Sequence, residues 1–255
     1  MKLLRIRWLL LVVVIGAASA GVIGSNVGCG SSDNGKAGSG GSSGGGTGGS
    51  SGGGTGGGGV TPKFSNTFDT DKQMWQLSDY VDANYYNWGA TTNADSGVGL
   101  DGGTAPTFEW NGTDGDPNPG SLKVTVNFTG FKQYIDPQVN IATPIDLTNR
   151  IIKARIRLAS GTFPSGGIQF HVSSGLTAPN AYVYVSAPFI NSTSLTTGNW
   201  ITISLDTSTV TPFDGRTFDP SQIVQIGIQF TTGDPYEGGT PAFGQAVFEI
   251  DTVQG

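Results

Sequence analysis

The sequence predicts an all-β fold for residues 60–255, a two-sheet antiparallel β-sandwich of the jelly-roll type. Two observations support this prediction. Apolar and polar residues alternate in short runs, which is the period of a half-buried strand, and Gly, Pro, Asn, Asp and Ser bound each run, as turns require. Because every such strand has one apolar face, two sheets packed face to face can bury all of these faces together.

The clearest alternation marks seven strands along the chain. They cover residues 121–128, 151–159, 167–172, 181–187, 200–207, 223–230 and 246–253. Two less regular strands are expected around 63–70 and 138–142. Successive side chains of a strand point to opposite faces, so Ile168, Phe170 and Val172 should lie in the core while their neighbours face outward.

Jelly-roll connectivity then predicts which strands are neighbours. One sheet should have the spatial order 121–128, 246–253, 151–159 and 200–207. The other should have the order 138–142, 223–230, 167–172 and 181–187, in which the last two strands form a hairpin. The two predicted outer faces differ in chemistry, and this difference leads to a functional hypothesis.

The outer face of the first sheet mixes charges, as expected of a solvated surface. It carries Lys123, Glu249, Lys153, Arg155, Arg157, Thr202 and Ser204. The outer face of the second sheet has no formal charge. It carries Gln169, His171, Tyr182, Tyr184, Gln225 and Gln229, with Gly227 leaving room in the middle of the row. Amides can pair with sugar hydroxyls and aromatic rings can stack on sugar C–H faces, so we predict carbohydrate binding here. The alternative is that Tyr and Gln merely fit exposed strands.

Aromatic residues are also frequent in the loops. The segment "ANYYNWG" (83–89) contains Tyr85, Tyr86 and Trp88, which we expect to form a groove wall. Trp75 and Trp200 are expected to pack in the core or at its rim.

Several segments together resemble the galactose-binding-like β-sandwich carbohydrate-binding modules. These segments are "FDTDKQMW" (68–75), "GSLKVTV" (120–126), "PIDLTNRIIKARIRLASG" (144–161), "GGIQFHVSSG" (166–175), "GNWITISLDTS" (198–208), "FDPSQIVQIGIQF" (218–230) and "AVFEIDTV" (246–253). The resemblance covers most of 64–253 and implies a ligand on the concave sheet, which corresponds to the second predicted face. This chain departs from the family in having no catalytic domain beside the module.

The resemblance also implies a structural calcium ion, for which Asp69 and Asp251 are the first candidate ligands. Asp71 and the loop 114–118 offer further oxygen atoms of the kind that calcium prefers. The alternative is that Asp, Asn and Gly simply form turns at these positions.

Residues 1–28 have the pattern of an export signal, with basic residues before the apolar run 8–24. The segment "NVGC" resembles the lipobox of bacterial lipoproteins, with Cys29 as the lipidated residue. Cleavage after "ASA" (18–20) or an uncleaved anchor are the alternatives. Residues 29–59 are rich in Gly and Ser and should form a disordered tether. We therefore expect either a lipid-anchored protein of the bacterial cell envelope, at the outer membrane, or a secreted one.

The net charge and the residue counts limit which classes of binding partner and activity fit this chain. The formal net charge of −6 becomes −9 when the three basic residues of the export signal are left out. This charge disfavours nucleic acid and acidic polymers, and a neutral polysaccharide fits it better. The chain has only three glutamates, Glu109, Glu237 and Glu249, and a single histidine. We therefore expect a monomeric, non-catalytic binding protein. A structural or adhesive surface protein and a sandwich-fold glycoside hydrolase or lyase remain the alternatives.

Overall fold

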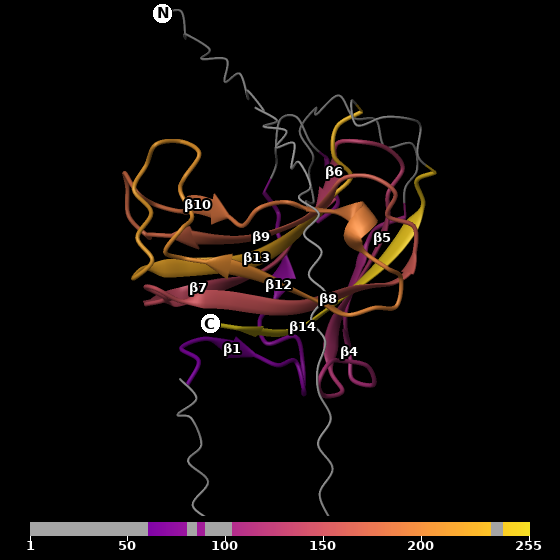
Figure 1. Cartoon of the computed structure of the whole chain (residues 1–255), viewed down its shortest axis with the longest axis horizontal. Helices are drawn as coiled ribbons and strands as arrows, with labels where there is room; N and C mark the ends of the chain where they lie inside the picture. Colours follow the sequence, from indigo (N-terminus) through magenta and orange to yellow (C-terminus); the bar gives the residue numbers. More distant parts are fainter. Residues whose placement is uncertain (1–60, 81–85, 90–103, 236–241) are drawn as a thin grey trace, which may run out of the picture. The chain divides into compact units, whose positions relative to one another are not determined.

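The structure is a computed structural model that describes residues 61–80, 86–89, 104–235 and 242–255. The chain divides into two units, Met1–Thr55 and Gly56–Gly255, and all of these described residues belong to the second unit. Their secondary structure is almost entirely strand, and their only helix is a single 3-10 turn, η1 (Ser192–Ser194). None of their helices is long and apolar enough to cross a membrane. The strands form two sheets, as Figure 1 shows.

The first sheet, called sheet A, has six strands in the order β12-β8-β14-β5-β4, and β1 pairs with β14. Its strands are β1 (Ser65–Asn66), β4 (Thr107–Asn111), β5 (Ser121–Asn127), β8 (Ile151–Gly161), β12 (Ile201–Asp206) and β14 (Gln245–Gln254). All of its pairings are antiparallel.

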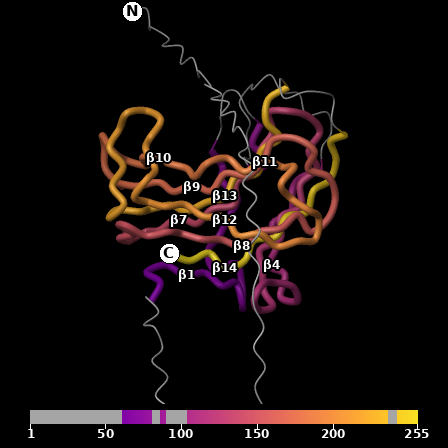
Figure 2. The backbone as a smooth tube through the Cα atoms, in the orientation of Figure 1, coloured from indigo at the N-terminus to yellow at the C-terminus, as the bar shows by residue number. Residues whose placement is uncertain are grey.

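The second sheet, called sheet B, has eight strands, and the main path runs β10-β9-β13-β6-β3. In addition, β7 pairs with β13 and β2, and β11 pairs with β9. Its strands are β2 (Gln76–Leu77), β3 (Tyr86–Asn87), β6 (Gln133–Ile135), β7 (Pro137–Ile145), β9 (Gly167–Ser174), β10 (Val183–Ser186), β11 (Ile190–Asn191) and β13 (Ile223–Thr231). Only the short β3–β6 pairing among these is parallel. Figure 2 shows β10, β9, β13 and β7 as successive neighbours.

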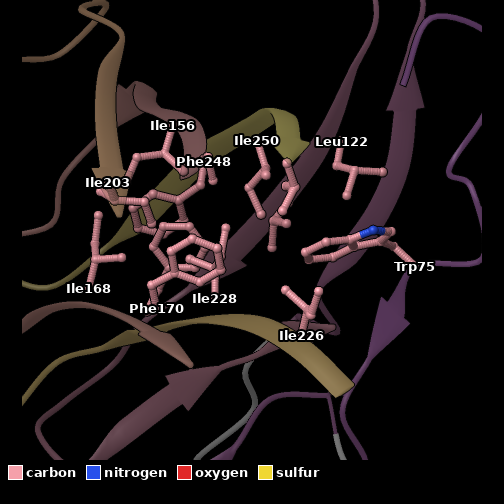
Figure 3. Packing of buried hydrophobic residues seen from close by; sticks show 14 of the residues in the cluster. Trp75, Leu122, Ile156, Ile168, Phe170, Ile203, Ile226, Ile228, Phe248 and Ile250 are labelled. Carbon is pink, nitrogen blue, oxygen red and sulfur yellow. The ribbon is translucent and has the colours of Figure 1, made fainter. Parts of the chain in front are cut away.

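The observed strand order confirms the predicted one in both sheets, because β5-β14-β8-β12 and β7-β13-β9-β10 are the orders that the connectivity implied. The predicted inward side chains are also buried. Phe170 on β9 and Ile156 on β8 lie in one cluster between the sheets (Figure 3). The rings of Phe230 on β13 and Phe248 on β14 stack across this interface, with centroids 4.0 Å apart. Burial of these apolar faces is the main term that holds the sandwich together.

Two features of the outer faces differ from expectation. Glu249 on sheet A was expected in a solvated surface, but it is buried and accepts hydrogen bonds from Asn111 and Arg157. Asp114, in the loop before β5, forms an ion pair with the same arginine, so this loop covers part of the outer face of sheet A. Tyr182 was expected within a strand, but β10 begins one residue later and Tyr182 has a left-handed backbone, with φ of 51°.

Candidate functional site

The outer face of sheet B carries a row of polar groups that runs across four strands. Gln225 on β13 lies between Asn140 on β7 and Ser173 on β9, and Tyr184 on β10 follows Ser173 in register. The Gln225 amide donates to Asn140 Oδ1 at 3.0 Å, and Ser173 Oγ donates to Gln225 Oε1 at 3.1 Å. Because the strands fix these side chains relative to one another, the row is ordered before any ligand arrives.

The centre of this face contains a charged group, contrary to the prediction of an uncharged row. Asp136, in the connection between β6 and β7, lies 2.8 Å from His171 Nε2 through its Oδ1 atom. His171 does point away from the core, but it is only 1% exposed. Its Nδ1 atom is buried and has no hydrogen-bond partner among the described residues. The histidine is therefore a covered part of the sheet and not a group at its surface.

The glycine in the middle of the row makes room for this histidine. A Cβ atom at Gly227 would lie 2.4 Å from both Cε1 and Nε2 of the His171 ring. The expectation that Gly227 leaves space for a polymer chain is thus wrong, because the imidazole occupies that space. Gly227 instead leaves the space that the imidazole on the neighbouring strand occupies.

Tyr184 covers the histidine from the solvent side. Its ring stacks on the imidazole with centroids 5.0 Å apart and planes 27° apart. Its hydroxyl donates to Gln169 Oε1 at 3.4 Å, and the Gln169 amide donates to Ser186 Oγ at 2.8 Å. Burial, followed by the nearby charge of Asp136, raises the pKa of the Tyr184 phenol well above its usual range. Gln229 lies beside Gln169 in register, so Tyr184, Gln169 and Gln229 extend the polar row toward the other end of the strands.

A cavity of about 450 Å³ adjoins this face beyond Gln169. It is lined by Gln169, Ser186, Ala187, Pro188, Phe189, Thr209, Val210, Thr211 and Phe213. Phe189 comes from the connection between β10 and β11, and Phe213 comes from the connection between β12 and β13. The Phe213 ring centroid is 6.5 Å from that of Tyr184. Neither phenylalanine was predicted as a site residue from the sequence. Each directly follows a proline in a predicted loop, which was the available signal.

The predicted aromatic wall is not formed as expected. Trp88 is only 6% exposed and belongs to the hydrophobic core. Its indole Nε1 donates to Gln133 at 3.3 Å, and its ring meets Tyr86 edge to face. The prediction that Trp88 lines a groove is therefore wrong, and Tyr85 lies outside the described residues. Tyr182 is about half exposed, at the turn that precedes β10.

The first candidate calcium ligand, Asp251, lies on β14, the central strand of sheet A. Asp251 on β14 is buried, and its Oδ2 atom accepts the backbone N–H of Asp116. A Cβ atom at Gly115 would lie 2.9 Å from Asp251 Oδ2, 2.1 Å from the Asn118 carbonyl oxygen and 2.6 Å from that of Gly120. These three oxygens therefore all lie close to Gly115. Burial is the main cause that raises the pKa of Asp251.

The other predicted ligands have different surroundings. The charge of Asp69 is close enough to contribute to the raised pKa of Asp251, and its carboxylate accepts a hydrogen bond from Thr67. Asp71 is exposed and closes a turn by accepting the backbone N–H of Gln73. Within the described ranges, no three His, Cys, Asp or Glu side chains gather as a metal cluster. Cys29, the predicted lipidation site, lies outside those ranges.

Comparison with known proteins finds similar folds among solved structures. No family model and no curated protein matches the chain. One similar structure is a carbohydrate-binding module of the β-sandwich superfamily, with 23% identity and a TM-score of 0.43 over 59% of this chain and 54% of the other, so the match spans about half of that module. The family 11 module from Clostridium thermocellum in complex with a β-1,3-1,4-mixed-linked tetrasaccharide is 10% identical, with a TM-score of 0.45 over 74% and 94%. A family 28 module specific for non-crystalline cellulose is 14% identical, with a TM-score of 0.44 over 76% and 92%.

Proposed function

We propose that this chain binds a neutral polysaccharide on the outer face of sheet B and does not catalyse its conversion. The observation that carries the proposal is the ordered row of Asn140, Gln225 and Ser173, which continues through Tyr184 to Gln169. Amide and hydroxyl groups offer both donors and acceptors, as a sugar hydroxyl requires. Because neighbouring strands already fix these groups, little side-chain entropy is lost when a ligand binds.

The carboxylates near the two outer faces favour binding over hydrolysis. Glycoside hydrolysis ordinarily uses a pair of carboxyl groups on either side of the scissile bond. On the proposed face, Asp136 is buried and its carboxylate contacts His171. On sheet A, Glu249 is buried between Asn111 and Arg157. Each of these carboxylates has a structural partner, so we assign both to the scaffold.

The proposal is tested by affinity electrophoresis of the full chain in gels that contain mixed-linkage β-glucan, hydroxyethylcellulose, xylan or galactomannan. We expect retardation by at least one of these polymers. Gln225→Ala should weaken it, because the variant removes two hydrogen-bonding groups from the centre of the row. Ser204→Ala is the matched control, since Ser204 is an exposed strand residue on sheet A. Migration that none of the four polymers changes would overturn the proposed function.

We further propose that a calcium ion binds in the loop beside Asp251. The residues that would hold it are Asp251 and the carbonyls of Asn118 and Gly120, with Asp69 nearby. Such an ion would neutralise a buried carboxylate and fix the loop before β5. Calcium should then raise the melting temperature of the wild type relative to a chelator, and Asp251→Asn should abolish this difference. Equal melting temperatures with calcium and with chelator would argue against the ion.

We also propose that Cys29 carries the lipid that anchors the protein to the bacterial cell envelope. The "NVGC" segment and the Gly/Ser-rich stretch after it support this proposal. Labelling of growing cells with radioactive palmitate should mark the wild type and leave Cys29→Ser unlabelled. Fractionation would then give the membrane that retains the protein. Equal labelling of both proteins, or of neither, would contradict lipidation at this residue.

A further inference from the structure

Two exposed phenylalanines converge on the cavity beside the proposed binding face. Phe213 is 79% exposed, and Phe189 is also exposed. A single exposed apolar side chain is common at protein surfaces and requires no explanation. Here, however, two rings from different connections line the same hollow next to strand β10. Both rings can therefore contact one ligand.

The rest of the cavity supplies polar groups without net charge. Gln169, Ser186, Thr209 and Thr211 contribute an amide and three hydroxyls, and the described lining residues carry no formal charge. Gln169 belongs to this cavity and to the polar row of sheet B. The two surfaces are thus continuous, so a polymer on the sheet could extend into the cavity. A pyranose ring, with apolar C–H faces and a polar edge, has the chemistry that this lining complements.

The loop that carries Phe213 is held against the β9–β10 hairpin. The Arg216 guanidinium donates to the Ala181 carbonyl at 2.8 Å and to Asp214 Oδ2 at 2.6 Å. The backbone N–H of Arg216 donates to the other oxygen of Asp214 at 3.1 Å. These contacts tie the segment that directly follows the phenylalanine to the hairpin, which lowers the entropy lost when the ring contacts a ligand.

We propose that Phe189 and Phe213 form an edge subsite in which one neutral sugar ring of the bound polysaccharide stacks, and that Arg216 is a positioning residue for Phe213. This inference rests on the proposed function, since the sugar ring belongs to the same polymer. It adds a contact outside the strands of sheet B. The β12–β13 connection then takes part in binding although β12 belongs to sheet A.

The test compares affinities of full-length variants for whichever of the four polymers retards the wild type. Phe213→Ala should weaken binding about tenfold, the effect of removing several tens of Å² of apolar contact. Phe189→Ala should also weaken it, and Phe213→Tyr should retain most of the affinity because it keeps the ring. Met74→Ala is the matched control, as Met74 is 81% exposed and does not line the cavity. Unchanged melting temperatures would show that the variants remain folded.

Arg216→Ala separates positioning from direct contact. It should weaken binding in the wild type and have little further effect in Phe213→Ala, since the residue acts through the ring. Wild-type affinity in both phenylalanine variants would overturn the edge subsite and leave the proposed function intact. An equal loss from Arg216→Ala in both backgrounds would overturn the positioning role. If the wild type binds none of the polymers, the proposed function and the subsite fail together.

Discussion

Gly227→Ala provides a direct test of how the proposed face is built. The added methyl group would lie 2.4 Å from Cε1 and Nε2 of His171 and 3.1 Å from the Cβ atom of Gln138. The imidazole sits between Gly227 and the Tyr184 ring, so it cannot move far outward without displacing that ring. Overpacking of this kind destabilises a folded protein by about 1–3 kcal/mol.

A displaced imidazole would also lose its contact with Asp136. That contact is 2.8 Å long and buried, and a hydrogen bond to a charged group contributes about 1.5–3 kcal/mol. Gly227→Ala should therefore lower the free energy of unfolding by about 2–5 kcal/mol, as measured by equilibrium urea denaturation. The affinity for the polysaccharide should fall as well, because Tyr184 and Gln169 would shift together with the histidine.

The control for this prediction is the same substitution in a His171→Ala background. Without the imidazole, the two contacts of 2.4 Å are gone and the closest one left is 3.1 Å, to the Cβ atom of Gln138. Alanine in a strand is also favoured over glycine by about 0.5–1 kcal/mol. Gly227→Ala should then be neutral or stabilising, which gives a coupling energy of about 2 kcal/mol or more in the double-mutant cycle. A similar loss of stability in both backgrounds would refute the interpretation that Gly227 exists to accommodate His171.

Three further predictions concern buried charges and pH. Arg157→Ala should lower the free energy of unfolding, measured by urea denaturation, by about 3–5 kcal/mol because it leaves the Glu249 carboxylate buried without its cation. Arg155→Ala breaks a more exposed ion pair with Asp116 and should lower it by about 1 kcal/mol or less. The raised pKa of Tyr184 means that only the unfolded state ionises just above pH 10, so stability should fall with rising pH there, and Tyr184→Phe should show a smaller fall. The raised pKa of Asp251 favours its protonated form in the folded state. In calcium-free buffer, the wild type should therefore lose stability relative to Asp251→Asn as pH rises through that pKa, and parallel pH profiles of the two proteins would contradict this.

The sandwich itself was predictable because alternation is a local property. Each strand shows in its own residues which side is apolar, so the inward set of Ile168, Phe170 and Val172 follows without any knowledge of partners. The strand order also followed, since jelly-roll connectivity allows few arrangements. These two rules together placed Gln169, Gln225 and Gln229 on one outer face.

The covering of that face could not be predicted in the same way. Alternation gives the direction of His171 but not what lies above it, and its burial depends on Asp136 and Tyr184, which belong to other parts of the chain. Phe213 likewise reaches the face through a loop from the other sheet. Trp88 shows the reverse error. An aromatic residue in a loop suggested exposure, but Trp88 directly follows a two-residue strand, β3, and lies in the core.

The pairing of β1 with β14 has a mechanical consequence. β1 contains two residues, and Lys63 and Phe64 just before it donate to the Gly255 carbonyl at 2.7 and 3.2 Å. Tension applied to the chain ahead of residue 61 would therefore act first on β1 and then on the end of β14 (Figure 1). Both strands belong to sheet A, while the polar row and Tyr184 belong to sheet B. A pulling force would thus act on sheet A, opposite to the proposed face. β1 would separate from β14 before the force reached the strands of sheet B.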